Sequence, residues 1–130
     1  MGAFDTLRIA GSSLGMHQVW LDTLAHNIAN VNTARSTDQT AFQAQMVIAR
    51  SQEGGGVEVN GIALSDPTGR VVHDPTHELA DADGYVRLPE VDLASQMSQL
   101  IMAQRGYQAS VQVTKNAQET YSSALQIGRS

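Results

Sequence analysis

Ser13, near the N-terminus, stands at the position of a hydrolase nucleophile. Residues 11–15 read Gly-Ser-Ser-Leu-Gly, which fits the G-x-S-x-G elbow that presents a catalytic serine. Such an elbow needs a strand, a sharp turn and a helix to expose the hydroxyl group. Here the motif lies inside a continuous helical pattern. We therefore expect these small residues to let another helix approach closely, and not to catalyse a reaction.

An acidic segment further along partly fits a calcium-binding loop. Positions 3, 5, 6, 8 and 12 of such a loop would be Asp81, Asp83, Gly84, Val86 and Glu90. Position 1 would be Leu79, which has no carboxylate, and no helical pattern precedes the segment, although an EF-hand needs both. The sequence favours an acidic turn that enters a strand.

The histidines offer a third candidate chemistry. His73 and His77 are four residues apart, which on a helix would be a metal-ligand spacing. Pro75 lies between them and breaks any helix, so we expect surface histidines in a loop. His17 and His26 fall on or near a row of residues that would pack one helix against another, where packed or interfacial polar residues are expected. We predict no catalytic residue, no metal site and no cofactor, and no enzyme.

Composition narrows the class of protein further. The 130 residues carry 13 acidic and 8 basic side chains, a formal net charge of −5, and no cysteine. An acidic chain lacks the basic surface that neutralises phosphates, so nucleic acid is not an expected partner. Without cysteine, disulfides and thiolate metal sites are excluded. No apolar run is long enough to span a membrane, and the N-terminus lacks the pattern of a cleavable secretion signal.

The N-terminal third shows a heptad pattern, which predicts one long helix. Leu7, Leu14, Leu21 and Ile28 recur every seven residues, and Ala10, His17, Leu24 and Val31 fall three residues after each of them. The pattern ends near residues 30–33, whose types prefer turns and caps.

The C-terminal third shows a softer heptad pattern. Asp92 is placed to cap its start, because a carboxylate can accept hydrogen bonds from the free amides of a first turn. One predicted row holds Leu93, Leu100, Tyr107, Thr114 and Tyr121, and the other holds Met97, Gln104, Val111, Gln118 and Leu125. Ala94 and Ile101 widen the apolar stripe. A helix of this length is longer than a compact globule of 130 residues is wide. We therefore expect the two helices to pair with each other and to protrude from the rest of the chain.

The middle of the chain consists of short candidate strands separated by segments rich in turn residues. Candidate strands are residues 42–48, 57–64, 69–73 and 85–88, separated by glycine- and proline-containing turns. The predicted fold class is α+β, in which two long terminal helices form an antiparallel coiled-coil-like pair that carries a small β-rich insert at one end. Residues 1–33 and 92–130 would form a helical assembly domain, and residues 34–91 the insert.

The charges are distributed unevenly. Residues 4–32 contain three charged side chains and residues 92–130 contain five, whereas a free helical hairpin normally carries many charged pairs on its outer faces. Uncharged polar faces with scattered apolar residues suit burial against other subunits, where unpaired charge is costly. A merely low-charge, solvated hairpin is the alternative.

Residues 26–33, His-Asn-Ile-Ala-Asn-Val-Asn-Thr, resemble the signature of the bacterial flagellar axial proteins, the family of rod, hook and hook-associated subunits. Residues 13–34 fit that family as a larger block. The segments 73–75 and 80–86 and the stretch 107–113 resemble a proximal rod member. The short length and the Asp-Gly-Tyr-Val segment favour this branch over its FlgB relative and over the longer distal rod and hook proteins.

The resemblance implies a structural subunit of the basal-body proximal rod, which polymerises helically and transmits torque across the periplasm. It implies export by the flagellar type III system without a cleavable signal. The implied partners are other copies of the chain, a FlgB-like proximal rod protein, FlgF- and FlgG-like distal rod proteins and a FliE-like adaptor at the export gate and MS ring. No direct membrane insertion is implied.

The residues that we expect at subunit interfaces lie on both helices. They are Leu14, Leu21, Leu24, Asn27, Ile28, Asn30, Asn32, Met97, Leu100, Ile101, Tyr107, Val111, Tyr121 and Leu125. The alternative from another functional class is a free-standing adaptor whose hairpin binds one partner helix.

Overall fold

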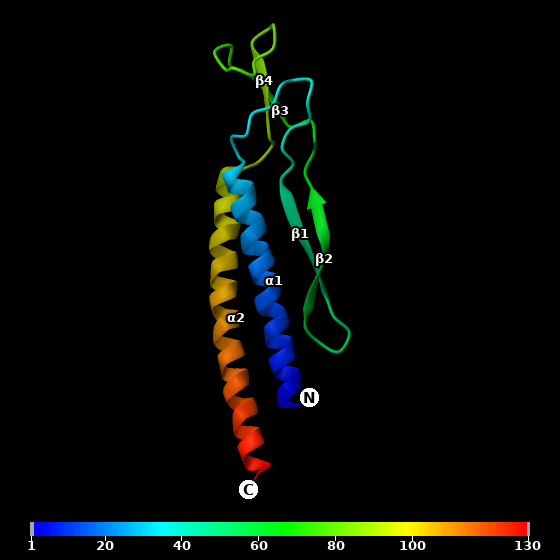
Figure 1. The fold of residues 1–130 in the computed structure, drawn as a ribbon, viewed down its shortest axis with the longest axis vertical. Helices are drawn as coiled ribbons and strands as arrows, with labels where there is room; N and C mark the ends of the chain where they lie inside the picture. The colour runs from blue at the N-terminus through cyan, green and yellow to red at the C-terminus, as the bar shows by residue number, and fades with distance from the viewer. Residues whose placement is uncertain (1, 130) are drawn as a thin grey trace.

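Two long helices enclose a β-rich segment in sequence, as the sequence predicts. The computed structural model describes residues 2–129. The elements in order are α1 (Ala3–Ala29), β1 (Gln45–Ser51), β2 (Val57–Leu64), β3 (Arg70–His73), β4 (Tyr85–Leu88) and α2 (Leu93–Ile127). Figure 1 shows α1 and α2 side by side and antiparallel, with the chain ends together at one end of the molecule. The α+β prediction is confirmed.

Local chemistry explains where the helices begin and end. The Asp92 carboxylate accepts a hydrogen bond from the Ala94 amide at 3.1 Å, which satisfies one free donor of the first turn of α2. At the start of α1, the Asp5 carboxylate accepts from the Gly2 amide at 3.2 Å. The chain leaves α1 through Asn30, whose amide reaches back to the carbonyl of Asn27.

The seam between the helices is narrow and lined by small residues on α2. Its buried residues are Ala10, Thr23, Leu24 and Asn27 on α1, and Ala103, Ser110 and Ala117 on α2. Four members of the first predicted α2 row are half-buried beside them, namely Leu100, Tyr107, Thr114 and Tyr121, whereas its first member, Leu93, is exposed. The second predicted row is wrong, because four of its five members, Met97, Gln104, Gln118 and Leu125, are exposed. Small side chains let the two backbones approach, so the buried face of α2 centres on its alanines.

Strands β1 and β2 form a two-stranded antiparallel sheet whose register places Gln45 opposite Leu64. The predicted strand over residues 42–48 therefore begins three residues too early. Residues 43 and 44 bond instead to Ser65, through the Gln43 side chain and the Ala44 amide. Residues 57–64 and 85–88 are strands as predicted, and β3 begins one residue later than expected.

The β1–β2 hairpin does not lie at the end of the helical pair, where the sequence placed the whole insert. Figure 1 shows it running back along α1, while β3 and β4 extend past the helix ends. Non-local contacts hold it there: the Ser12 hydroxyl accepts from the Val57 amide at 3.1 Å. The hairpin thus covers the side of α1 that α2 leaves open.

A second sheet pairs β3 with β4 and closes the far end. Arg70 lies opposite Leu88 and His73 opposite Tyr85. The segment after α1 joins this sheet through a bridge in which the amides of Arg35 and Arg87 each donate to the other's carbonyl at 2.8 Å.

Candidate assembly surface

Asn27 joins three elements at the end of the helical pair where α1 ends and α2 begins, which we call the closed end. Its side-chain amide donates to the Gln45 carbonyl at 2.7 Å and to the Gln96 side chain at 2.9 Å, and its side-chain oxygen accepts from the Gln45 amide at 2.8 Å. The residue is 1% exposed. Its amide thus links α1, β1 and α2 within one subunit, which gives this residue of the 26–33 signature an intramolecular role.

The serines of the hydrolase-like motif are used in packing. Ser12 donates to the Ile9 carbonyl at 2.7 Å and accepts from β2, and the hydroxyl groups of Ser13 and Ser110 lie 2.9 Å apart across the helical seam. Both serines sit inside α1, with no strand or turn at the motif. The geometry of a nucleophile elbow is therefore absent from this segment.

The tip of the β1–β2 hairpin is anchored to the start of α1. The Arg8 guanidinium donates to the carbonyls of Gly54 and Gly55 at 3.0 and 3.3 Å. Gly54, Gly55 and Gly56 all have φ values between 87° and 100°, a backbone region that L side chains rarely adopt. The glycine run thus lets the turn fold tightly onto α1.

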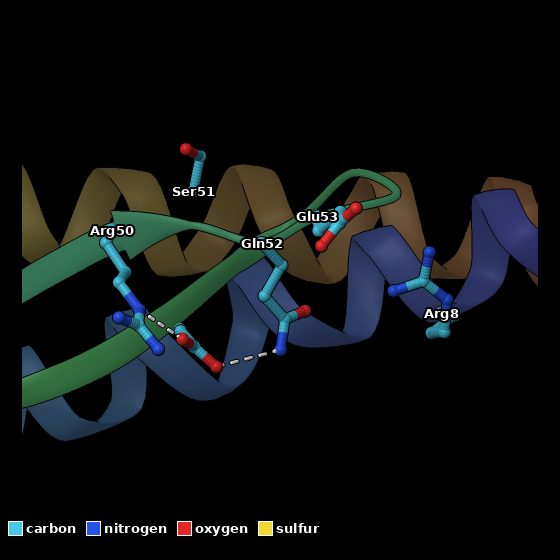
Figure 2. A pocket seen from close by; sticks show the side chains of 6 residues that line it. Arg8, Arg50, Ser51, Gln52 and Glu53 are labelled. Carbon is cyan, nitrogen blue, oxygen red and sulfur yellow. Dashed lines mark hydrogen bonds and ion pairs between the residues drawn. The ribbon is translucent and has the colours of Figure 1, made fainter.

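A shallow pocket beside this tip is lined by charged side chains, of which Arg8, Arg50 and Glu58 have partners within the chain. Figure 2 shows the Arg50 and Gln52 side chains converging on one carboxylate, which belongs to Glu58. The hydrogen bond from Arg50 is the largest cause that lowers the pKa of Glu58. Because the Glu58 carboxylate is paired and open to solvent, it is not poised to act as an acid or base in the pocket.

The acidic segment at the far end forms a turn. The Asp81 carboxylate accepts from the amides of Asp83 and Tyr85 at 3.0 and 2.9 Å and from the Thr37 hydroxyl at 2.8 Å. These hydrogen bonds, that from Tyr85 foremost, lower the pKa of Asp81. The carboxylate is thus occupied by the turn, in place of the calcium site that the spacing resembles.

Each of the two loop histidines, His73 and His77, makes its own local contact. The His77 ring accepts from the Leu79 amide at 3.0 Å, and the His73 ring packs against Tyr85. Within residues 2–129, no three histidine, cysteine or acidic side chains gather closely enough to hold a metal ion.

The outer surface of α2 carries the apolar side chains that α1 leaves uncovered. Met97, Ile101, Met102, Val113 and Leu125 are each more than half exposed. The helix has 35 residues, and only Arg105, Lys115 and Glu119 are charged. An exposed helix surface with so little charge and so many apolar side chains is typical of a surface that another protein covers.

The structure divides the predicted interface residues into three groups. Leu24 and Asn27 are buried within the chain; the half-buried ones are Leu14, Leu21, Ile28, Asn30, Leu100, Tyr107, Val111 and Tyr121; and the exposed ones are Asn32, Met97, Ile101 and Leu125. The heptad pattern did not select Met102 or Phe4, which are also exposed. Their apolar character outside the heptad rows was the available signal.

Comparison with known proteins identifies the family. Residues 82–127 match the family model described as the C-terminal region of flagellar basal body rod FlgEFG proteins. The flagellar basal-body rod protein FlgC of Yersinia enterocolitica is 34% identical over an alignment that covers 99% of this chain and 100% of the relative. The FlgC proteins of Salmonella typhimurium and Bacillus subtilis are 31% and 29% identical over the same 99% of the chain.

The chain belongs to the FlgC family of flagellar basal-body rod proteins. The resemblance drawn from residues 26–33 and 80–86 is thereby confirmed, including the preference for this branch of the proximal rod. The chain is a structural subunit of the basal-body rod, a role that implies contact with copies of itself and with other rod proteins. The FlgC relatives are structural proteins and indicate no enzymatic activity. Neither helix, over the part of the chain that is described, is long and apolar enough to cross a membrane.

Proposed function

We propose that this FlgC-family subunit polymerises helically through the outer faces of α1 and α2, and that the polymer transmits torque across the periplasm as part of the proximal rod. The observation that carries the proposal is the exposed apolar surface of α2. Covering such surface on assembly would stabilise the polymer by about 25 cal/mol for each Å² removed from water. Because contacts are spread along a long helix, twisting forces would be shared among many side chains.

The proposal assigns the predicted interface residues by exposure. Met97, Ile101 and Leu125 would contact neighbouring subunits directly. The half-buried seam residues, Leu100 and Tyr107 among them, would contribute their outer edges and hold the pair in shape. Residues 1–33 and 92–130 would act as the assembly unit, and residues 34–91 as the part that faces solvent or neighbouring subunits.

The proposed partners and route follow from the family. The subunit would contact FlgB-like, FlgF-like and FlgG-like rod proteins and a FliE-like adaptor. It would reach the periplasm through the flagellar type III channel. The small number of charges on α1 and α2 supports this role, since few ionic groups would need to be desolvated when subunits pack together.

A pair of matched substitutions on α2 tests the assembly surface. Ile101→Asp puts a charge on an exposed apolar position, and Ser98→Asp puts the same charge on an exposed polar position. Both purified variants should keep the helical circular dichroism of the wild type, because neither site lies in the seam. We expect Ile101→Asp to abolish swimming and incorporation into isolated basal bodies, because a charge buried between subunits lacks a partner.

Ser98→Asp is expected to keep most of the motility. Normal swimming and normal basal bodies with Ile101→Asp would contradict the proposal. A wild-type subunit that binds one partner protein but never self-associates would instead favour the adaptor role.

A further inference from the structure

The seam of α2 repeats itself along the helix. Its buried residues, Ala103, Ser110 and Ala117, follow one another at seven-residue intervals, and all three side chains are small. A shift of α1 by one heptad, about 10 Å along the axis, would bring a similar small residue to each contact. This row by itself therefore does not determine the axial register of α1 on α2.

One contact in the middle of the seam lacks this repeat. The His17 ring of α1 lies against Gly106 of α2, so closely that a Cβ atom placed on Gly106 would lie 2.3 Å from His17 Nε2 and 2.5 Å from Cδ2. At such a distance, either the ring or the backbone of α2 would have to shift. The ring occupies space that exists only because residue 106 is glycine.

Hydrogen bonds hold the ring in this position. His17 Nδ1 donates to the Ser13 carbonyl at 2.8 Å, since a carbonyl oxygen can only accept. The Ser110 hydroxyl lies 3.3 Å from the same nitrogen and 2.9 Å from the Ser13 hydroxyl. The ring is therefore fixed on α1 and also contacts α2 through polar atoms.

A heptad shift would remove the space for this ring. Displaced by seven residues, His17 would face Gln99 or Val113, both of which carry a Cβ atom. Among residues 93–130, Gly106 and Gly128 are the only glycines, and Gly128 lies beyond the end of α2. The ring thus fits α2 at one position along the seam.

We infer that His17 and Gly106 form a register key that stops the terminal helices from sliding along each other. The Asn27–Gln96 hydrogen bond at the closed end agrees with the same register, but Gln96 is a long, flexible side chain. The key lies ten residues further along α1, about 15 Å away. It sets the height of the exposed α2 side chains relative to the β1–β2 hairpin, and it acts within one subunit whether or not subunits assemble.

Substitution of glycine by alanine gives a test in which the sign of the effect is diagnostic. In a helix interior, Gly→Ala alone should raise the melting temperature by about 2–5 °C. We expect Gly106→Ala to lower it in the wild-type background, because the new methyl group meets the His17 ring. In the His17→Ala background, Gly106→Ala should raise it. Gly15→Ala, where a new Cβ would meet nothing within 4 Å, should raise it in both backgrounds.

Cysteine pairs then report the register directly, since the chain has no cysteine of its own. Ser13→Cys with Ser110→Cys marks the observed register, and Ser13→Cys with Ala117→Cys or with Ala103→Cys marks a one-heptad shift. With His17 and Gly106 present, only the first pair should form a disulfide at high yield. In the His17→Ala background, the shifted pairs should cross-link at least several-fold more.

Two results would overturn the inference. One is a Gly106→Ala variant that is stabilised in the presence of His17. The other is a His17→Ala background in which shifted pairs cross-link no more than before. Should Gly106→Ala fail to fold, recovery of folding by adding His17→Ala would support the key, and continued failure would count against it.

Discussion

The two ends of the helical pair differ in the hydrogen bonds and contacts that their side chains make within the chain. At the closed end, Asn27 bonds to both Gln45 and Gln96, Asp92 caps α2, and the Arg35–Arg87 bridge ties the following loop to β4. The opposite end, where α1 begins and α2 ends, is the open end. There the helices meet through the Phe4 and Tyr121 rings, whose centroids are 6.4 Å apart. Phe4 is itself 63% exposed.

This difference separates folding from assembly along one molecule. At the closed end, the buried polar side-chain atoms of the described residues have partners within the chain, with the exception of Arg87 Nε. The subunit can therefore establish its fold there alone. At the open end, α2 continues beyond the start of α1 (Figure 1) and exposes Leu125. Under the proposed function, that end gains its remaining contacts from neighbouring subunits.

Leucine truncation at the two ends should give the largest contrast. Leu24 is 2% exposed and Leu125 is 53% exposed. We expect Leu24→Ala to lower the free energy of unfolding by about 2–5 kcal/mol, because it leaves a cavity, and Leu125→Ala to change it by less than about 0.5 kcal/mol. Urea unfolding followed by circular dichroism measures both values. Equal losses would show that the open end is as well packed as the closed end.

The Asn27 hydrogen bonds should give the next largest effect. Asn27→Leu keeps the approximate volume but leaves the backbone groups of Gln45 without these partners, which costs about 1–3 kcal/mol of stability. The matched variant Asn32→Leu changes an exposed asparagine of the same signature and should be nearly neutral. Urea unfolding of both variants checks the difference, and faster proteolysis within β1 should accompany Asn27→Leu. If the two asparagines cost the same, Asn27 would not be the link described here.

The Asp81 turn, beyond the closed end, should give the smallest effect. Its carboxylate pKa lies below the ordinary value of 3.8, so the ionised form stabilises the fold above that pH. This contribution is lost as the pH falls below 3.8 through the lower folded-state pKa. We expect thermal unfolding of wild type to depend more steeply on pH in this range than that of Asp81→Asn. Asp83→Asn, whose carboxylate makes none of these bonds, should retain the wild-type slope.

Much of the fold could be predicted because its signals are local. Heptad spacing located both helices, Asp92 marked the start of α2, and turn residues bounded β2 and β4. The second heptad row of α2 failed for a physical reason. A search for apolar periodicity favours large side chains such as Met97 and Leu125. The residues that are buried between closely packed helices are small ones such as Ala103 and Ala117, because large side chains would keep the helices apart.

The interface prediction was limited in a similar way. Leu24 and Asn27 carry the pattern expected of interface residues, yet their side chains are buried within the chain. A sequence pattern shows that a side chain requires burial or a polar partner, but not whether its own chain or a neighbour supplies it. Exposure in the folded subunit is what separates Met97 and Ile101 from them.

The sequence by itself determined the elements, the low charge of the helices and the family, because periodicity, turn chemistry and the 26–33 signature are readable along the chain. Only the tertiary structure decided where the β1–β2 hairpin lies and which register the helices adopt. The hairpin is held along α1 by Arg8, Ser12 and Asn27, and the register by His17 opposite Gly106. Each of these contacts joins residues 18 to 89 positions apart, and their geometry exists only once the chain has folded.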